Sequence, residues 1–246
     1  MPTDHSEHSD HPHPPAPAGT VSPARPGWPE IAAGLIALVA ATAAVLVFGP
    51  PGLDLDPVPY GLVLAAWSGV AGLTGFAAAA LLRIRSWGAF SVRRTTWRWM
   101  LAGVAGGLVA LVVKAVFISA ITTLTGFDSD PQGMYYDAAG GGVLPLILTF
   151  AFLAVLTPIG EEFLFRGVVT NALLRYGPVV GVLSSSLIFA VFHGVNIILP
   201  AAVVVGVIAA EMMRRSGSIW PAVAVHAVNN TALPLLVMLT GYAGPG

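Results

Sequence analysis

The sequence predicts an all-α, polytopic membrane protein: a helical bundle of about seven transmembrane helices. Of its 246 residues, 56% are hydrophobic and 9% are charged. A soluble domain has roughly 25% charged residues. The apolar residues are grouped in stretches of about the 20 residues that a helix needs to cross a bilayer. The net charge of -1 argues against nucleic acid as a partner, and the absence of cysteine excludes disulfides and thiolate metal ligands.

Residues 1–27 are predicted to form a disordered cytoplasmic tail. The segment is rich in His, Pro, Ser and Asp, a composition that buries too little apolar surface to fold. No basic segment leads directly into a short apolar run, so we do not expect a signal peptide. A metal-chelating role is open to the tail histidines, but a solvated tail is the favoured interpretation of His5, His8, His11 and His13.

The apolar helices follow the tail. Turn-forming residues such as Gly177-Pro178 separate them. The sixth is too short for a full span, so we expect it to be tilted or incomplete. The chain divides into the tail, N-terminal helices over 28–142 and a helical core over 143–240. The expected helices lie near 30–48, 61–82, 100–124, 143–174, 179–198, 200–213 and 218–240.

The positions of the arginines predict an orientation. The 83–98 loop contains five arginines, and Arg175, Arg214 and Arg215 lie in later loops on the same side. Cytoplasmic loops carry the excess of Lys and Arg. The N-terminus is therefore predicted to be cytoplasmic and the C-terminus extracytoplasmic, in the plasma (inner) membrane.

Two adjacent acids interrupt the fourth helix. Glu162 and Arg166 are four residues apart, in the order that favours an ion pair, so Arg166 is predicted to neutralise Glu162. Glu161 points about 100° away around the helix and has no local partner. A desolvated carboxylate has a raised pKa, which suits general acid–base chemistry. Glu161 is therefore the candidate base.

Two histidines of the apolar body are expected to join Glu161. Glu161 and His193 each lie 16 residues from Gly177, so an antiparallel hairpin places them at one depth. His226 and Asn230 are one helical turn apart, and such an amide can orient an imidazole or hold an oxyanion. Asn229 is expected to point elsewhere. The depth of His226 fits less well, since it lies only 9 residues beyond Gly217.

One free carboxylate, two imidazoles and an amide can activate a water and stabilise a tetrahedral intermediate. The two histidines with the carboxylate could also hold a zinc-like ion with an open position. Both routes lead to hydrolysis of a peptide bond by water.

These motifs resemble the CPBP family, the CAAX proteases and bacteriocin-processing proteins, also called the Abi or type II CAAX prenyl endopeptidase family. The resemblance covers residues 143–240, and residues 1–142 match only as further membrane helices. The family pattern is Glu-Glu-x-x-x-Arg, Phe-x-x-x-His and His-x-x-x-Asn on successive helices. Here the three read Glu161-Glu162-Phe-Leu-Phe-Arg166, Phe189-Ala-Val-Phe-His193 and His226-Ala-Val-Asn-Asn230.

The resemblance implies a cavity open to the cytoplasm and intramembrane cleavage of a membrane-associated protein or peptide in the lipid bilayer. By position, Glu161 would be the water-activating base, completed by His193, His226 and Asn230 as metal ligands or oxyanion stabilisers. The Glu162–Arg166 pair would support the site. The need for a divalent metal such as zinc stays open. One Lys, ten Arg and short loops are typical of a bacterial chain, for which a CAAX substrate is not expected.

Two other functions fit the same motifs. A proton-coupled transporter would use Glu161, His193, His226 and Lys114 as a relay, although no convincing internal repeat is present. A non-catalytic membrane scaffold or immunity protein would use the motifs only to hold helices together. Lys114, midway along the third helix, would otherwise snorkel or pair with an acid.

Overall fold

The structure, a computed structural model, describes residues 24–49, 53–126 and 131–241. These residues form helices and connecting turns, with no strand among them, which confirms the all-α prediction. The tail histidines lie outside the described residues.

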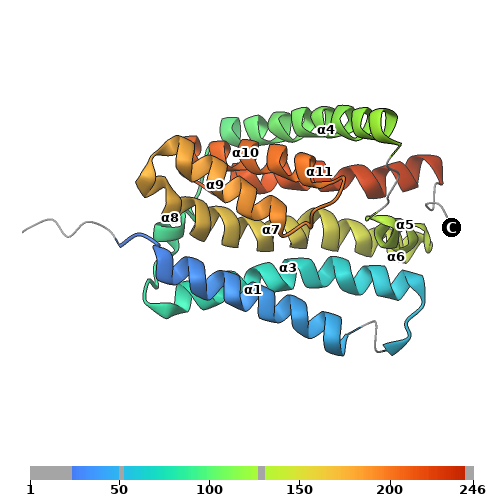
Figure 1. The fold of residues 1–246 in the computed structure, drawn as a ribbon, viewed down its shortest axis with the longest axis horizontal. Helices are drawn as coiled ribbons and strands as arrows, with labels where there is room; N and C mark the ends of the chain where they lie inside the picture. The colour runs from blue at the N-terminus through green and yellow to red at the C-terminus, as the bar shows by residue number, and fades with distance from the viewer. Residues whose placement is uncertain (1–23, 50–52, 127–130, 242–246) are drawn as a thin grey trace, which may run out of the picture.

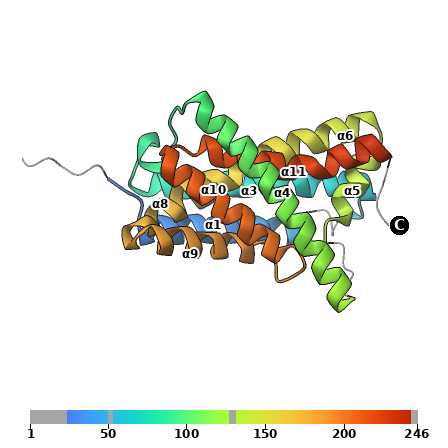
Figure 2. The same cartoon turned by 90° about the horizontal axis from the view of Figure 1, so that it is seen from above.

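Five helical segments are long and apolar enough to cross a membrane, and Figure 1 shows them along the long axis of one bundle. Figure 2 shows α4 crossing α10 and α11 obliquely. These segments confirm the polytopic prediction. They are α1 (Trp28–Phe48), α3 (Pro57–Leu82), α4 (Trp97–Thr125), the continuous run Val143–Tyr176 and α11 (Trp220–Thr240).

The sequence explains where several helices begin and end. A proline stands in the first turn of α1, α3 and α11, where its missing N–H is not needed. Gly126 ends α4 and Gly217 ends α10, with φ of +65° and +67°. This left-handed conformation suits glycine and closes the last turn of a helix.

The run Val143–Tyr176 changes its helical type near the paired acids. Pro158 lies in the first turn of α7 and cannot supply the N–H of an interior helical bond. The flanking segments are π-helical, and such wide turns often occur at functional sites. The order is α6 (Val143–Thr149), η2 (Phe150–Leu156), α7 (Thr157–Glu162), η3 (Phe163–Thr170), α8 (Asn171–Leu173) and η4 (Leu174–Tyr176).

Two of the seven expected helices do not form full spans. α9 (Pro178–Val191) has 14 residues and α10 (Leu199–Ser216) has 18, and neither is among the five spanning segments. Figure 1 shows them running from one end of the bundle to its middle and back. Residues 192–198 form the connecting loop, where the Asn196 side chain accepts from the Ile198 N–H and donates to the His193 carbonyl.

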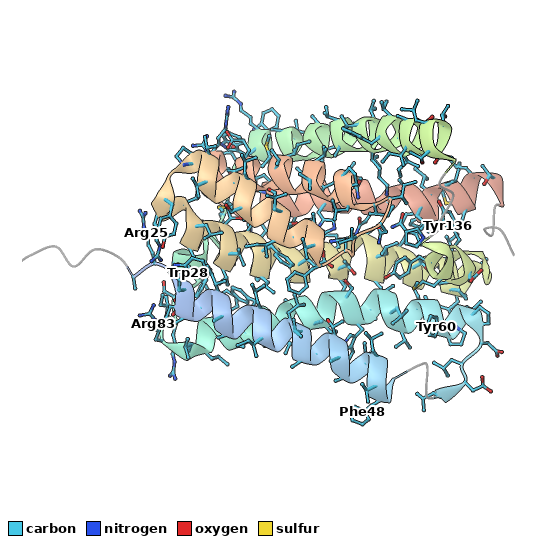
Figure 3. The ribbon with its side chains drawn as sticks, viewed as in Figure 1. Arg25, Trp28, Phe48, Tyr60, Arg83 and Tyr136 are labelled. Atoms are coloured by element: carbon cyan, nitrogen blue, oxygen red, sulfur yellow. The ribbon has the colours of Figure 1, made fainter. Side chains whose placement is uncertain are left out.

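The predicted basic loops gather at one end of the bundle. Arg83 binds Glu30 of α1 with Nε–Oε1 at 2.5 Å, and Arg93 binds the Gly217 carbonyl at 2.5 Å. These contacts join the 83–98 loop, including η1 (Trp87–Phe90), to the start of α1 and to the α10–α11 turn. Which side of the membrane this end faces stays a prediction. Figure 3 shows Arg25, Trp28 and Arg83 at this end, and Tyr60 and Tyr136 at the other.

α3 and α7 touch through their backbones. A Cβ added to Gly160 would lie 2.0 Å from the Gly69 carbonyl oxygen, and one added to Gly72 would lie 2.5 Å from the Gly160 carbonyl carbon. Small residues permit such close crossings of membrane helices. This glycine crossing brings Ser68 of α3 against Glu161 of α7.

We predict that Gly160→Ala lowers the thermal unfolding midpoint. Overpacking costs about 1–3 kcal/mol, and a clash with backbone cannot be relieved by a rotamer change. That cost exceeds the roughly 1 kcal/mol that Ala gains over Gly in helix propensity. Circular dichroism of the protein in detergent measures the midpoint. Gly88→Ala is the control, because a Cβ added there would lie no nearer than 3.9 Å to another group, the Ser86 hydroxyl. Equal midpoints for the two variants would contradict the prediction.

Candidate active site

The Glu161 carboxylate is buried and only half satisfied. Its Oε1 accepts a hydrogen bond of 2.6 Å from the Ser68 hydroxyl. Its Oε2 has no hydrogen-bond partner and lies 3.9 Å from Nε2 of both His193 and His226. The structure therefore brings together the acid and both histidines that the sequence singled out, from α7, the α9–α10 loop and α11.

The neighbouring Glu162 carboxylate is fully buried and shared. Its Oε2 lies 2.9 Å from Nε of Arg166, which confirms the predicted ion pair. The alignment is that of an ion contact rather than a hydrogen bond. The Arg166 guanidinium also lies over the Phe189 ring, 4.6 Å from its centroid. Glu162 Oε1 accepts a hydrogen bond from His226 Nδ1 at 2.9 Å. The Glu162 carboxylate therefore contacts both the Arg166 guanidinium and the His226 ring.

The Nδ1 atom of each histidine ring is engaged in a hydrogen bond. A carboxylate or carbonyl oxygen only accepts, so the ring nitrogen facing it carries the proton. His226 Nδ1 faces Glu162, and His193 Nδ1 lies 3.1 Å from the Phe189 carbonyl. In the neutral rings both Nε2 atoms are then unprotonated. The Nε2 lone pairs of His193 and His226, which lie near the Glu161 carboxylate, are therefore available to bind a proton or a ligand.

The prediction that His193 lies on a helix is wrong. α9 ends at Val191, and His193 occupies the following turn. Gly194 has φ of +84°, a left-handed conformation that takes the chain out of the helix. The last carbonyls of a helix lack intrahelical partners, and the Phe189 carbonyl meets the His193 ring instead.

Of the two roles open to Asn230, orienting His226 or holding an oxyanion, the structure does not show the first. Asn230 Nδ2 donates to the Leu153 carbonyl of η2 at 3.0 Å, so it ties α11 to η2. Glu162 orients the imidazole, because a carboxylate forms the stronger, charge-assisted bond. Asn229, expected to point elsewhere, also lines the cavity, and its Oδ1 has no partner.

A cavity of about 550 Å³ collects these groups. Its walls include apolar residues of α1 and α3, Glu161, both histidines, and the asparagines Asn196, Asn229 and Asn230. Sequence reasoning missed Ser68 and Tyr135, which also line it. Ser68 could have been noticed as a hydroxyl beside Gly69 in an apolar stretch.

Lys114 lines the same cavity, and its Nζ donates to Gln132 Oε1 at 3.5 Å. Tyr135 lies in α5 (Gly133–Gly140), outside the five spanning segments. Burial raises the pKa of Tyr135 to about 12, and the charge of Glu161 contributes to this rise. Its phenol therefore remains a hydrogen-bond donor at neutral pH.

The donor set suits a metal in its chemistry. Metal-ligating histidines usually donate their other N–H to a carboxylate or carbonyl, as His193 and His226 do. The geometry is looser: across the described ranges, no three His, Cys, Asp or Glu side chains are grouped so as to hold a metal ion. The 3.9 Å between each Nε2 and Glu161 Oε2 reflects this looseness.

Residues 143–232 match the family model described as Type II CAAX prenyl endopeptidase, Rce1-like. The matched segment runs from α6 into α11 and contains all three motifs, which confirms the resemblance. Neither the curated proteins nor the solved structures give a match. With its spanning helices, the chain is a multi-pass membrane protein, and its segment 143–232 is similar to a family of proteases, which act on peptides.

We predict that Arg166→Met strongly destabilises the fold. Removing one partner of a buried ion pair costs about 3–5 kcal/mol, because Glu162 keeps its charge without the cation. Arg214→Met is the control. Arg214 is partly exposed, and its partner Glu211 retains Arg215. Exposed pairs contribute about 0–1 kcal/mol. Thermal unfolding in detergent measures the midpoint of both variants. Similar midpoints would show that the buried Glu162–Arg166 pair does not stabilise the fold more than the exposed pair does.

Proposed function

We propose that this protein is a membrane-embedded endopeptidase in which Glu161 activates the water that attacks a peptide bond. One observation carries the proposal: Glu161 Oε2 is buried, has no hydrogen-bond partner and faces two imidazole Nε2 atoms in a cavity. A general base needs a free lone pair within reach of the proton that it removes. The substrate is a membrane-associated protein or peptide.

In the proposed reaction, Glu161 Oε2 takes a proton from water while the water oxygen attacks the carbonyl carbon. The same carboxyl then gives that proton to the leaving amine as the C–N bond breaks. Ser68 positions Glu161 through its bond to Oε1. Asn230 has two N–H donors and uses one on Leu153, so the other is free for the oxyanion.

Glu162 and Arg166 act as positioning residues in this proposal. Glu162 holds the His226 ring with its Nε2 toward Glu161. Arg166 balances the charge of Glu162, which would otherwise be buried alone. The pair therefore lets one acid orient the site while its neighbour reacts.

A divalent ion such as zinc is compatible with the same residues. His193 and His226 would hold it through Nε2, and the ion would lower the pKa of its bound water. Glu161 accepts the proton of the water in either case, so the proposal does not depend on the ion.

We predict that Glu161→Gln abolishes cleavage while leaving the unfolding midpoint unchanged. General-base catalysis contributes about 10²–10⁴-fold in rate, and an amide cannot accept the proton. The assay incubates the purified protein in lipid nanodiscs with apolar membrane peptides and identifies products by mass spectrometry. Glu211→Gln, the same change in a side chain outside the cavity, is the control.

Cleavage that survives in Glu161→Gln would exclude Glu161 as the base. Dialysis of the unaltered protein against a chelator extends the experiment. Activity that is lost and then restored by zinc identifies the metal-bound form. Flux of protons or solute without cleavage would identify a transporter instead.

We also predict that Ser68→Ala lowers kcat several-fold without a large loss of stability. The lost hydrogen bond is worth about 1 kcal/mol, which corresponds to roughly a five-fold change in rate. Ser186→Ala is the matched control, because its buried hydroxyl donates to the Val182 carbonyl of its own helix at 2.7 Å. Equal kcat values for the two variants would mean that Ser68 does not position the base.

A further inference from the structure

Among the residues that the structure describes, Lys114 is the only lysine or arginine that lines the cavity. It lies in α4, outside the matched segment 143–232, and the proposed chemistry does not use it. Its ammonium has one hydrogen bond, to the neutral Gln132 at 3.5 Å. No Asp or Glu within residues 24–49, 53–126 and 131–241 forms an ion pair with it.

A cation in this position favours an anionic ligand. An ionisable side chain inside a spanning helix is costly unless it is paired, and it usually marks a functional site. An ammonium has three donors, of which Lys114 uses one on Gln132. A ligand that brings a negative charge would supply the missing partner. The half-buried setting of Lys114 strengthens that attraction relative to water.

The surroundings narrow the chemistry of the ligand. The cavity walls near α1 and α3 are largely apolar, with residues such as Leu38, Leu46 and Leu64. A single lysine is a compact point charge without the bidentate fork that arginine offers to phosphate. One positive charge therefore matches one carboxylate. The phenol of Tyr135 lines the same cavity and can donate to that carboxylate as well.

We propose that Lys114 forms a carboxylate subsite that selects substrates, with Gln132 holding its ammonium in place. This inference rests on the proposed peptidase function. Lys114 and Glu161 line one cavity of about 550 Å³, so a single bound peptide can reach both side chains. A short stretch of peptide then places one carboxylate at Lys114 while a peptide bond lies at Glu161. That carboxylate is either an acidic side chain or the chain terminus.

Binding to the Glu161→Gln variant tests the subsite without requiring catalysis. The probes are three peptides of alternating Ala and Leu with an N-terminal fluorophore. The first is a neutral C-terminal amide, the second has a free C-terminal carboxylate, and the third is an amide with one internal Glu. We expect at least one carboxylate peptide to bind about ten-fold tighter than the neutral one, since a hydrogen bond between charged groups is stronger than one between neutral groups. The tighter of the two identifies the source of the carboxylate.

Substitutions then assign the preference to Lys114. In the Glu161→Gln background, Lys114→Gln should reduce the affinity for carboxylate peptides to that for the neutral peptide, and Lys114→Arg should keep most of the preference. Arg98→Gln neutralises another cation of α4, one that stacks on Trp97 and lies outside the cavity, and should change nothing.

Equal binding of all three peptides by Glu161→Gln would overturn the proposal, and this comparison needs no change at Lys114.

The binding measurements are made in phosphatidylcholine nanodiscs. A preference that disappears in phosphatidylglycerol would show that a lipid phosphate occupies Lys114, which also overturns it. Cleavage by the unaltered protein is measured separately. Lys114-dependent binding without any cleavage would reject the peptidase function and leave the carboxylate subsite standing.

Discussion

The buried carboxylate of Glu162 is the interaction on which the rest of the site depends. It contacts Arg166 within its own helical run and His226 on α11, and the side chains of both acid and arginine are fully buried. In a medium of low dielectric constant, three such groups are stable only together. The Glu162 anion therefore fixes α11 beside α7, sets the proton position on the His226 ring and compensates the guanidinium charge.

Two adjacent acids have different roles because a helix turns about 100° per residue. Glu162 faces α11, where cationic and polar partners use both of its oxygens. Glu161 faces α3 and the cavity, where Ser68 uses one oxygen and leaves the other without a partner. The π-helical turns on either side of α7 accompany this arrangement. Sequence neighbours thus differ in chemistry through the helices that they face.

Local spacing predicted part of the site. The i,i+4 rule gave the Glu162–Arg166 pair, and equal spacing from Gly177 placed His193 at the depth of Glu161. The bonds that orient the site join residues far apart in the chain: Ser68 to Glu161 spans 93 positions, and Glu162 to His226 spans 64. They depend on how each helix is rotated about its axis, which periodicity does not report. The turn at His193 was missed because apolar residues continue past the end of α9.

The glycine crossing of α3 and α7 makes the geometry of the site insensitive to the thickness of the bilayer. A membrane of different thickness is accommodated by tilting helices and repacking side chains. Where two backbones touch, no side chain lies between them to repack, so the pair moves as one unit. Adjustment is left to helices with extensive lipid-facing surfaces, such as α1 and α4. The Ser68–Glu161 contact can therefore keep its geometry while the protein adapts to lipids of different chain length.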